Sequence, residues 1–569
     1  MLPTSLQTVA LLAPELVLVA AALAAYLGGA FLGLRHGWLL ALAGIAVAAA
    51  VAGQAAAGPA VGSGGVVVDG FATFIRWTTL GLGGLVALVQ AGDLFTSAAS
   101  RGPGHHRGGT CEEAGTFLVL LAGLSLTGLA GDLVLLFAGL ELVSIPTYVL
   151  LGLKRTDARG QEASLKYFFL SLVASALFLY ALVCLYGIGG STNLQSIAAR
   201  LRSADPASAA TALTLLPVAL GMAVVGAAFR LAAVPMHFYA PDVYEGTGPG
   251  NAALLSTLPK VAGIVVLGRL LGLGITADPA AAAGPAALGL LEPFWMLAVI
   301  LAAVTMTVGN VMALWQRNLR RLLACSSIAH AGYLLVGIAA AAAAAATRAA
   351  PPAADGSAVP ALAGTVALGG MTATLFYLAT YALATIGVFG AIAYLGHRWP
   401  EWTGGGPRPP REEIAVVDDL DGLATTNPVA AFAIAVLLLS LAGIPPLPGF
   451  WGKLSLATAA LEVDWSEPFV GGGRRAWFVG VALVLVVNAA IAAAYYLRII
   501  AAIYFKPARQ GVQADGGLAA GVAMLACLVL AVAVSIQPGR LFSAASRAGD
   551  ALAGTLPIAV ATVPRTISP

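Results

Sequence analysis

Apolar runs long enough to cross a lipid bilayer recur along almost the whole chain of 569 residues. Each approaches the roughly 20 residues that a transmembrane helix needs. Hydrophobic residues make up 59% of the chain and charged residues only 10%, which is too few to cover the surface of a soluble protein of this length. The sequence therefore predicts an all-α polytopic membrane protein. About fourteen transmembrane helices are expected, near residues 11–33, 37–57, 70–90, 114–131, 133–152, 161–188, 210–238, 249–272, 291–315, 320–346, 364–397, 425–461, 476–504 and 517–537.

The distribution of Lys and Arg among the connecting loops predicts the orientation in the membrane. Loops after odd-numbered helices carry about fourteen of these residues and loops after even-numbered helices carry about five, and basic loops stay in the cytoplasm. Both termini are therefore expected on the outer, periplasmic side of a bacterial inner membrane. No basic segment precedes the first apolar run, which Pro14 and Glu15 interrupt, so we expect a retained helix and not a cleaved signal peptide.

Two of the predicted helices contain prolines and a basic residue where a helix should be continuous. One break lies around Arg230 and Pro235 in the seventh helix, and the other lies in GIPPLPGFWG before Lys453 in the twelfth helix. Each break falls in the fourth helix of a five-helix block, and a block with an odd number of helices makes the second copy enter the membrane from the opposite side. We therefore predict two inverted five-helix repeats. The expected division is three helices and a loop at 1–113, a first repeat at 114–272, a second repeat at 291–504, and a C-terminal helix and tail at 505–569.

The reactive side chains argue against a redox or nucleotide site in this chain. Its four cysteines lie far apart with no CxxC motif, so neither an Fe–S cluster nor a zinc site is predicted. Neither a GxGxxG motif after a strand nor a Walker-type loop occurs. The net charge of +3 is small and scattered, so nucleic acid is not an expected partner, whereas the lipid bilayer is. Any electron or nucleotide chemistry is expected in partner chains.

Glu141 and Arg230 are candidate partners inside the membrane. A charge at the centre of a bilayer costs about 2.5–3.5 kcal/mol, so charged residues there are rare and usually functional. Glu141 lies near the middle of its apolar run, where burial favours the protonated acid unless a Lys or Arg lies nearby. Arg230 does not release a proton, but it can hold Glu141 ionised as a permanent counter-charge. Two alternatives remain open: a protonated Glu141 that only packs helices, and an Arg230 that clamps the broken backbone.

Lys260 and Lys453 are candidate proton carriers. Lys260 directly follows Pro259 inside its apolar run, and Lys453 follows the proline-rich break. Burial favours the neutral amine, so a buried lysine can release and regain a proton near neutral pH. A fixed structural ion pair is the alternative for both. Lys166 lies near a helix end, where an anchor in the headgroup region and a partner for an acid are both open.

Two histidines and two acids complete the candidates. His237 lies just past the first break and His330 lies in RLLACSSIAHAGYLL. Imidazole titrates near neutral pH and suits proton relay, although a lone histidine in a helix is often a satisfied core residue. Asp242 and Glu245 are expected at the membrane surface, where they either order the loop or form a proton exit.

Five segments are together similar to one known family. They read FAGLELVSIPTYVLLGLKR, EASLKYFFLSLVASALFLYAL, FRLAAVPMHFYAPDVYEG, RRLLACSSIAHAGYLL and LAGIPPLPGFWGK. In these segments the chain resembles the antiporter-like membrane subunits of proton-pumping NADH:quinone oxidoreductase (complex I), and the subunit N family in particular. PDVYEG followed by LPK is the most specific part of the resemblance, because the larger sister subunits and the Mrp-type antiporters carry a different sequence after the broken helix.

The resemblance implies fourteen helices and a proton path that begins at an acid in the fifth helix and a base in the seventh. The family usually has lysine at the position of Arg230. Arginine does not release its proton, so this departure argues against direct proton transfer through the seventh helix and leaves an electrostatic role for Arg230. The resemblance also implies other membrane-arm subunits as partners, with quinone, NADH, FMN and Fe–S clusters bound by partner subunits and no cofactor bound by this chain. The expected proton pathway comprises Glu141, Lys166, Arg230, Lys260, His330 and Lys453.

Two other functions fit the same residues. An Mrp-type cation/proton antiporter subunit without redox coupling would share the fold and the buried charges. PDVYEG argues against it, and a sodium-dependent pH gradient in vesicles without NADH would favour it. A purely structural subunit would need Lys260 and Lys453 for assembly but not for turnover. The function expected first is proton translocation coupled to quinone reduction elsewhere in the complex.

Overall fold

The computed structural model describes most of the chain. Three connecting segments rich in Gly, Pro and Ala or in charge, at 98–113, 348–363 and 400–415, are predicted from the sequence to be surface loops, and they fall largely outside the described residues. Several of the basic loop residues that predict the orientation also fall outside them. The described ranges are 4–34, 36–54, 61–63, 65–94, 110–154, 157–202, 206–273, 285–349, 362–398, 412–464, 473–508, 512 and 514–553.

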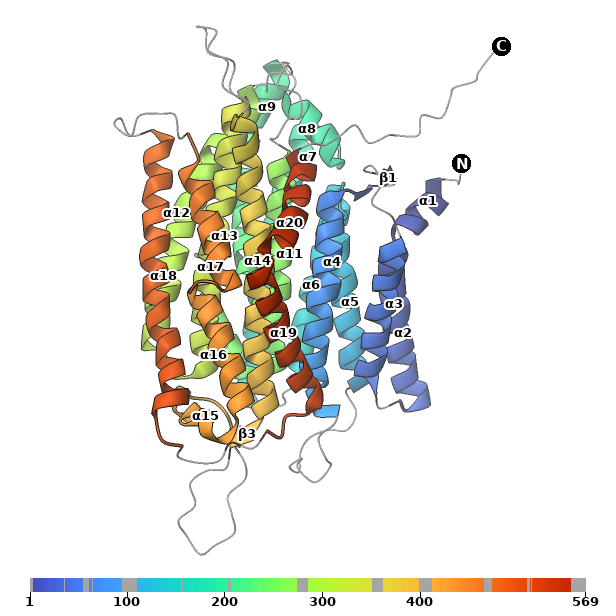
Figure 1. Ribbon diagram of the computed structural model, residues 1–569. Coiled ribbons are helices and arrows are strands. Elements are labelled where there is room, and N and C mark those ends of the chain that lie inside the picture. Colours follow the sequence, from blue (N-terminus) through green and yellow to red (C-terminus); the bar gives the residue numbers. More distant parts are fainter. Residues whose placement is uncertain are drawn as a thin grey trace, which may run out of the picture.

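Helices that stand side by side in one bundle make up nearly all of the described structure (Figure 1). Thirteen of them are long and apolar enough to cross a membrane. The half-helices α16 (Pro428–Ala442) and α17 (Pro448–Leu461) follow one another along one span and together form the twelfth predicted helix, which completes the expected fourteen. The prediction of an all-α polytopic membrane protein is therefore confirmed. The thirteen helices are α2 (Ala13–Leu32), α3 (Gly37–Gln54), α4 (Gly70–Gln90), α5 (Thr110–Gly128), α6 (Leu133–Lys154), α7 (Ala158–Gly189), α9 (Pro206–Leu231), α11 (Pro249–Gly272), α12 (Pro285–Trp315), α13 (Leu319–Ala349), α14 (Leu362–Leu395), α18 (Arg474–Phe505) and α19 (Leu518–Ile536).

Short elements lie at the two ends of the bundle or extend its helices. In Figure 1, α1 and α8 lie at one end, and β3 and α15 lie at the other. β1 pairs with β2 and β3 pairs with β4, both antiparallel. The short elements are the helices α1 (Thr4–Leu11), α8 (Leu194–Arg202), α10 (Ala240–Gly246), α15 (Leu423–Thr426) and α20 (Pro538–Ala553), the 3-10 helices η1 (Ala91–Leu94) and η3 (Val417–Leu420), and the strands β1 (Val61–Ser63), β2 (Val66–Val68), β3 (His397–Arg398) and β4 (Glu412–Glu413).

Short polar side chains and glycines set several helix ends. Asp69 accepts a hydrogen bond from the backbone N–H of Ala72 at the start of α4, and Asn427 accepts one from Ala430 at the start of α16. Gly443 follows the last residue of α16 with a φ of 89°, a left-handed conformation that glycine adopts without strain. Local sequence therefore encodes both ends of α16, including the end that forms the second break.

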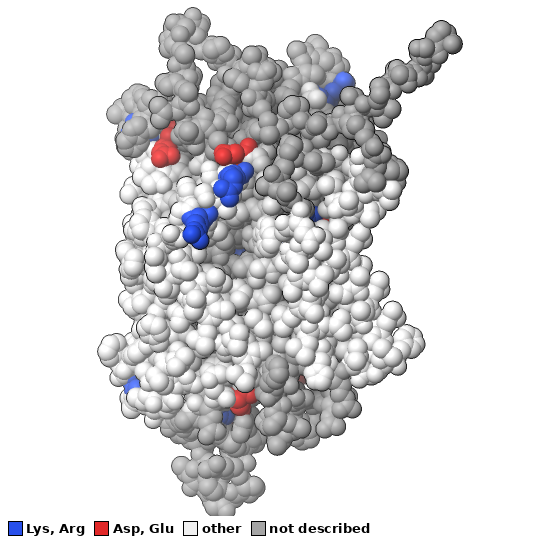
Figure 2. Space-filling model, turned by 45° about the vertical axis from the view of Figure 1, so that its right-hand side comes forward, with Lys and Arg blue, Asp and Glu red and all other residues white. Residues whose placement is uncertain are grey.

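The most buried helices lie in the centre of the bundle. The apolar segments of α11 and α13 are 100% buried and that of α14 is 94% buried, whereas those of α2 and α18 are 28% and 33% buried. α14 packs against α11, α13 and both halves of the divided span. Figure 2 shows a lateral face on which few charged residues interrupt the surface between the two ends of the bundle. Charged groups on the central helices are therefore shielded from lipid by the outer helices.

Both predicted helix breaks are present. α9 ends at Leu231, residues 232–239 form turns, and the short helix α10 follows. α16 ends at Ala442 and α17 begins at Pro448. The inverted relation of the two five-helix blocks and the predicted division of the chain stay predictions.

Candidate functional site

The acid and the guanidinium group that were predicted to pair inside the membrane do so. Glu141 of α6 and Arg230 of the last turn of α9 form an ion pair, with 3.4 Å between Oε1 and Nη2. Arg230 also donates to the hydroxyl of Ser144, about one turn after Glu141 on α6. Ser175 of α7 donates to Glu141 at 2.5 Å. The Arg230 side chain is 3% exposed and the Glu141 side chain is 25% exposed, so the pair is enclosed on its arginine side and open on its acid side.

Lys260 lies where α9 ends. It belongs to α11 and is fully buried. Its ammonium group donates to the carbonyl oxygen of Leu231, the last residue of α9, and to that of Ser327 on α13 at 2.9 Å. Carbonyl groups at the C-terminal end of a helix lack partners within the helix and carry partial negative charge. The helix break itself therefore supplies the acceptor that stabilises the Lys260 ammonium group.

Lys453 repeats this arrangement at the second break. Its ammonium group donates to the carbonyl oxygens of Leu441 and Ala442, the last two residues of α16, at 2.9 Å each. It also lies 4.9 Å from the centroid of the Tyr333 ring, which is a cation–π contact. In these contacts Lys260 and Lys453 both bind carbonyl groups at a helix end, and not the carboxylate that a fixed ion pair requires.

His330 of α13 is held by two tyrosine hydroxyls and approaches the Lys453 site. Its ring nitrogens lie 2.6 Å from the hydroxyl of Tyr377 and 3.0 Å from that of Tyr496. The centroid of its ring is 5.6 Å from that of Tyr333, the ring that faces Lys453. His330 is almost completely buried, so both of its polar atoms are satisfied by side chains of the bundle.

On its other side, His330 is linked to the Lys260 site. Its ring centroid lies 4.6 Å from that of Tyr381 on α14. The Tyr381 hydroxyl donates to the hydroxyl of Ser327 at 2.9 Å, and the carbonyl group of Ser327 accepts from Lys260. A row of contacting polar and aromatic groups, which we call the buried row, thus crosses the bundle. Its acidic, basic and histidine members are Glu141, Arg230, Lys260, His330 and Lys453.

Lys166 belongs to a separate cluster, in which its side chain is 40% exposed. Its ammonium group lies 2.7 Å from Glu162 and 2.8 Å from Asp242. Arg321 pairs with both Asp242 and Glu245 at 2.8 Å. None of the described hydrogen bonds or ion pairs joins this cluster to the buried row. The two acids after the first break therefore tie α10 to α7 and α13, and the pathway role of Lys166 stays a prediction.

A pH-dependent contribution to stability is expected from Asp242. Burial raises the pKa of Asp242, but hydrogen bonds from Lys166 and Arg321 outweigh it and hold the pKa below its ordinary value. A depressed carboxyl pKa stabilises the fold above the ordinary carboxyl range, and this stability is lost as pH falls through the depressed pKa. Asp242→Asn should lower the free energy of unfolding at neutral pH by about 1 kcal/mol or less, because the pair is partly exposed to solvent. The loss should vanish in acid.

Heat unfolding of the purified protein over a pH series measures this effect. Glu162→Gln is the matched control, because Glu162 pairs with the same lysine but is 62% exposed. It should have almost no effect at any pH. Equal losses from the two substitutions at neutral pH would contradict the assignment.

Two buried ion pairs were not predicted. Glu15 and Arg76 share two hydrogen bonds, at 2.8 and 2.9 Å, and Ser125 donates a third to Glu15 at 2.5 Å. Arg269 pairs with Asp69 at 2.7 Å. Sequence reasoning treated Glu15 only as an interruption of the first apolar run. The available signal was that Glu15, Arg76 and Arg269 are charged residues within apolar runs, where each needs a partner.

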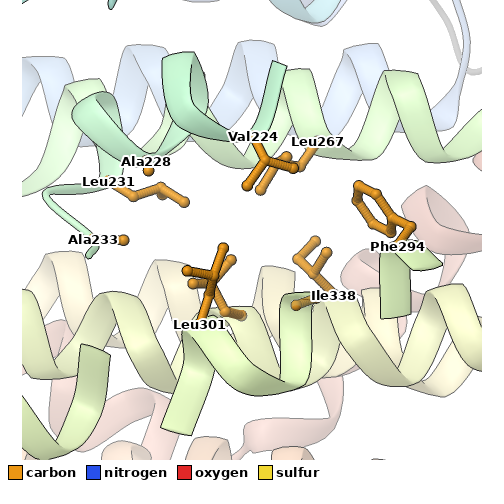
Figure 3. Close-up of a pocket in the computed structure, with 10 residues that line it drawn as sticks. Val224, Ala228, Leu231, Ala233, Leu267, Phe294, Leu301 and Ile338 are labelled. Carbon is orange, nitrogen blue, oxygen red and sulfur yellow. The ribbon is translucent and has the colours of Figure 1, made fainter. Parts of the chain in front are cut away.

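Two cavities lie along α9, one of them beside the first break, and both are apolar. One is lined in part by Leu231, Ala233 and Leu301, which point into it in Figure 3. The second shares Phe294 with the first and is lined by leucine and alanine side chains. Neither lining contains a charged residue, so the buried row does not run through them. Within the described ranges, no group of three or more His, Cys, Asp or Glu side chains is arranged to hold a metal ion.

The family of this chain is shown by its similarity to known proteins. The family described as NADH:quinone oxidoreductase/Mrp antiporter, transmembrane, matches residues 130–350 and 360–470. NADH-quinone oxidoreductase subunit N of Desulfovibrio desulfuricans is 35% identical over 543 residues, which cover 93% of this chain and 94% of that protein. A chain of respiratory complex I from Thermus thermophilus is 27% identical with a TM-score of 0.66, covering 94% of this chain and 99% of that one. A chain of an Mrp complex from a Dietzia species shares the fold, with 23% identity, a TM-score of 0.70, and coverage of 95% of this chain and 97% of that one. The chain therefore belongs to the NADH-quinone oxidoreductase subunit N family.

Proposed function

We propose that this chain is a proton-translocating subunit in the membrane arm of a bacterial NADH:quinone oxidoreductase. The observation that carries the proposal is the buried row, which places an acid, a permanent cation, a histidine and two lysines inside the bundle. Such residues are costly within a membrane and are retained where they move charge. Quinone reduction in other subunits would drive proton transfer along this row.

The Glu141–Arg230 pair is the proposed point of control. Arg230 keeps its proton, so it acts through its charge and does not carry the proton itself. Two unit charges about 4 Å apart interact by roughly 4 kcal/mol at an effective dielectric constant of 20. Moving one charge against 100 mV costs about 2.3 kcal/mol. The interaction energy gained or lost when this one pair closes or opens is therefore larger than the cost of moving one proton against the membrane potential, so the pair can gate a proton step.

Lys260 and Lys453 are the proposed carriers, with His330 between them. Several links in the row are not proton-transfer contacts. Lys260 binds the carbonyl groups of Ser327 and of Leu231, the residue after Arg230. His330 meets Tyr381 and Tyr333 ring to ring, and Tyr333 faces Lys453. Neither a carbonyl group nor a ring face passes a proton. Side-chain movement at these links would complete the path, which would make them the gates of the row.

The same proposal includes the surroundings of the chain. Its partners would be other membrane-arm subunits, and NADH, FMN, Fe–S clusters and quinone would be bound by partner subunits. The loops after odd-numbered helices would face the cytoplasm, with both termini on the periplasmic side of the inner membrane. The blocks at 114–272 and 291–504 would be inverted repeats, each with one helix break and one lysine bound to the end of the broken helix.

Replacing Glu141 with Ala tests the proposed function. Without the acid, Arg230 is left as a buried charge with no counter-charge, and the switchable pair is lost. Proton pumping and coupled quinone reduction should fall roughly tenfold or more in membranes that contain the assembled complex. Glu162→Ala removes an exposed acid from the next helix and should leave both rates unchanged.

Wild-type pumping by assembled complexes that carry Glu141→Ala would refute the proposal. A sodium-dependent pH gradient formed by vesicles without NADH would instead favour the cation/proton antiporter function.

A further inference from the structure

The backbone after α9 is held at two points by side chains from two other helices. Lys260 of α11 donates to the carbonyl oxygen of Leu231, the last residue of the helix. Three residues later, the backbone N–H of Val234 donates to the hydroxyl oxygen of Thr305 on α12 at 3.1 Å. One contact therefore satisfies a freed acceptor and the other satisfies a freed donor of the same break.

Thr305 differs from the buried threonines that bond only to their own helix. Its side chain is fully buried, and its oxygen accepts from a segment more than seventy residues earlier in the chain. Thr127 of α5, in contrast, is equally buried and donates to Gly123 of its own helix. α12 lies in the second five-helix block and the break lies in the first, so Thr305 connects the two blocks at the break.

The space beside the break makes this contact consequential. Leu231 and Ala233 line an apolar cavity together with Ala298 and Leu301, both of α12 (Figure 3). Thr305 lies one helical turn after Leu301. The side chains that line the cavity offer no acceptor for the N–H of Val234. The Thr305 hydroxyl is therefore the acceptor that fixes the segment at this point.

We propose that Thr305 is a positioning residue for proton transfer at Lys260. By holding Val234, it keeps the carbonyl group of Leu231 facing the Lys260 ammonium group, and a shift of α12 would move this acceptor. The inference rests on the proposed function. It adds to that function a contact through which the second block positions Lys260, the proposed proton carrier of the first block.

Three substitutions at Thr305 test the inference in membranes that contain the assembled complex. Thr305→Val keeps the shape and removes the acceptor, Thr305→Cys keeps a weak acceptor, and Thr305→Ser keeps the hydroxyl. The number of protons pumped per NADH oxidised should fall severalfold in the valine variant, fall less in the cysteine variant, and return to the wild-type value in the serine variant. Thr127→Val is the matched control and should pump as the wild type does.

Hydrogen–deuterium exchange of peptides that cover 232–239 gives a second measurement. The exchange rate should rise roughly tenfold in Thr305→Val and stay unchanged in Thr305→Ser and Thr127→Val. Should Thr305→Val fail to assemble, the comparison of Thr305→Cys with Thr305→Ser decides by the same two measurements.

Wild-type pumping and exchange in both the valine and the cysteine variants would overturn the inference. If Lys260→Met abolishes pumping while every Thr305 variant pumps normally, the inference alone fails. If Lys260→Met itself pumps normally, the proposed function fails.

Discussion

Replacing Lys260 with methionine is expected to abolish proton transfer through this chain. Methionine fills much of the same space but carries no proton, and Lys260 is the buried carrier nearest to the Glu141–Arg230 pair in the row. A positioned proton-transfer group typically contributes 10²–10⁴-fold to a rate, so pumping should fall at least about a hundredfold. Coupled quinone reduction should fall with it. Both are measured in membranes that contain the assembled complex.

A second substitution separates the carrier from the structural contact. Lys260→Arg keeps a permanent donor for the carbonyl groups of Leu231 and Ser327, but arginine does not release its proton. It should therefore preserve assembly and still lose pumping. Lys506→Met is the control for pumping, because Lys506 is an exposed lysine that pairs with Asp418 and Asp421 outside the buried row. Assembled complexes of this variant should pump as the wild type does.

The structural alternative gives the opposite result for the same variants. If Lys260 only binds the end of α9, Lys260→Met should reduce the amount of assembled complex while the complexes that do form pump normally. Lys260→Arg should then be close to wild type. Such an outcome would remove Lys260 from the pathway.

Much of the fold was predictable because the backbone polar groups of a segment in lipid must be hydrogen-bonded within the protein, which restricts the structures that can span a bilayer. Apolar runs of about 20 residues must become helices in lipid, and prolines such as Pro448 end or begin them. Both breaks were therefore visible in the sequence. The division of the twelfth span into two half-helices follows from Gly443 and the prolines after it, which are local signals.

The Glu141–Arg230 contact was predictable for a related reason. Two opposite charges in apolar runs must find partners, and few partners exist in a chain with so few charges. The partners of Lys260 and Lys453 were not predictable in this way, because backbone carbonyl groups carry no sequence signature. Only the three-dimensional structure shows that each lysine binds the end of a broken helix.

Lys166 illustrates the limit of reasoning from position along a helix. Its place near a helix end left an anchor and an acid partner equally open. The structure shows an acid partner, Asp242, which lies on a short helix that a sequence pattern does not place in space. Thr305 is a stronger case, because a threonine in an apolar run gives no sign that its oxygen reaches another helix.

The buried pair of Glu15 and Arg76 is expected to dominate the packing of α2 against α4 and α5. Their side chains are 3% and 5% exposed, and the pair joins α2 to α4, while Ser125 connects it to α5. Arg76→Leu leaves the Glu15 carboxylate buried without its counter-charge. Removing one partner of a buried pair typically costs about 3–5 kcal/mol, so the free energy of unfolding should fall by that amount.

The double substitution Glu15→Leu with Arg76→Leu separates the charge from the packing. It removes both charges at once, so no uncompensated group remains, and replacing a buried pair by apolar side chains is often close to neutral. Heat unfolding of the purified complex should therefore show a large loss for Arg76→Leu and recovery of most of it in the double variant. Equal losses in the two variants would mean that the shape of the two side chains, and not their charge, holds these helices together. The pair lies outside the buried row. Assembled complexes of the double variant should therefore pump at the wild-type ratio of protons to NADH. This result would show that the two charges support the fold and do not take part in transport.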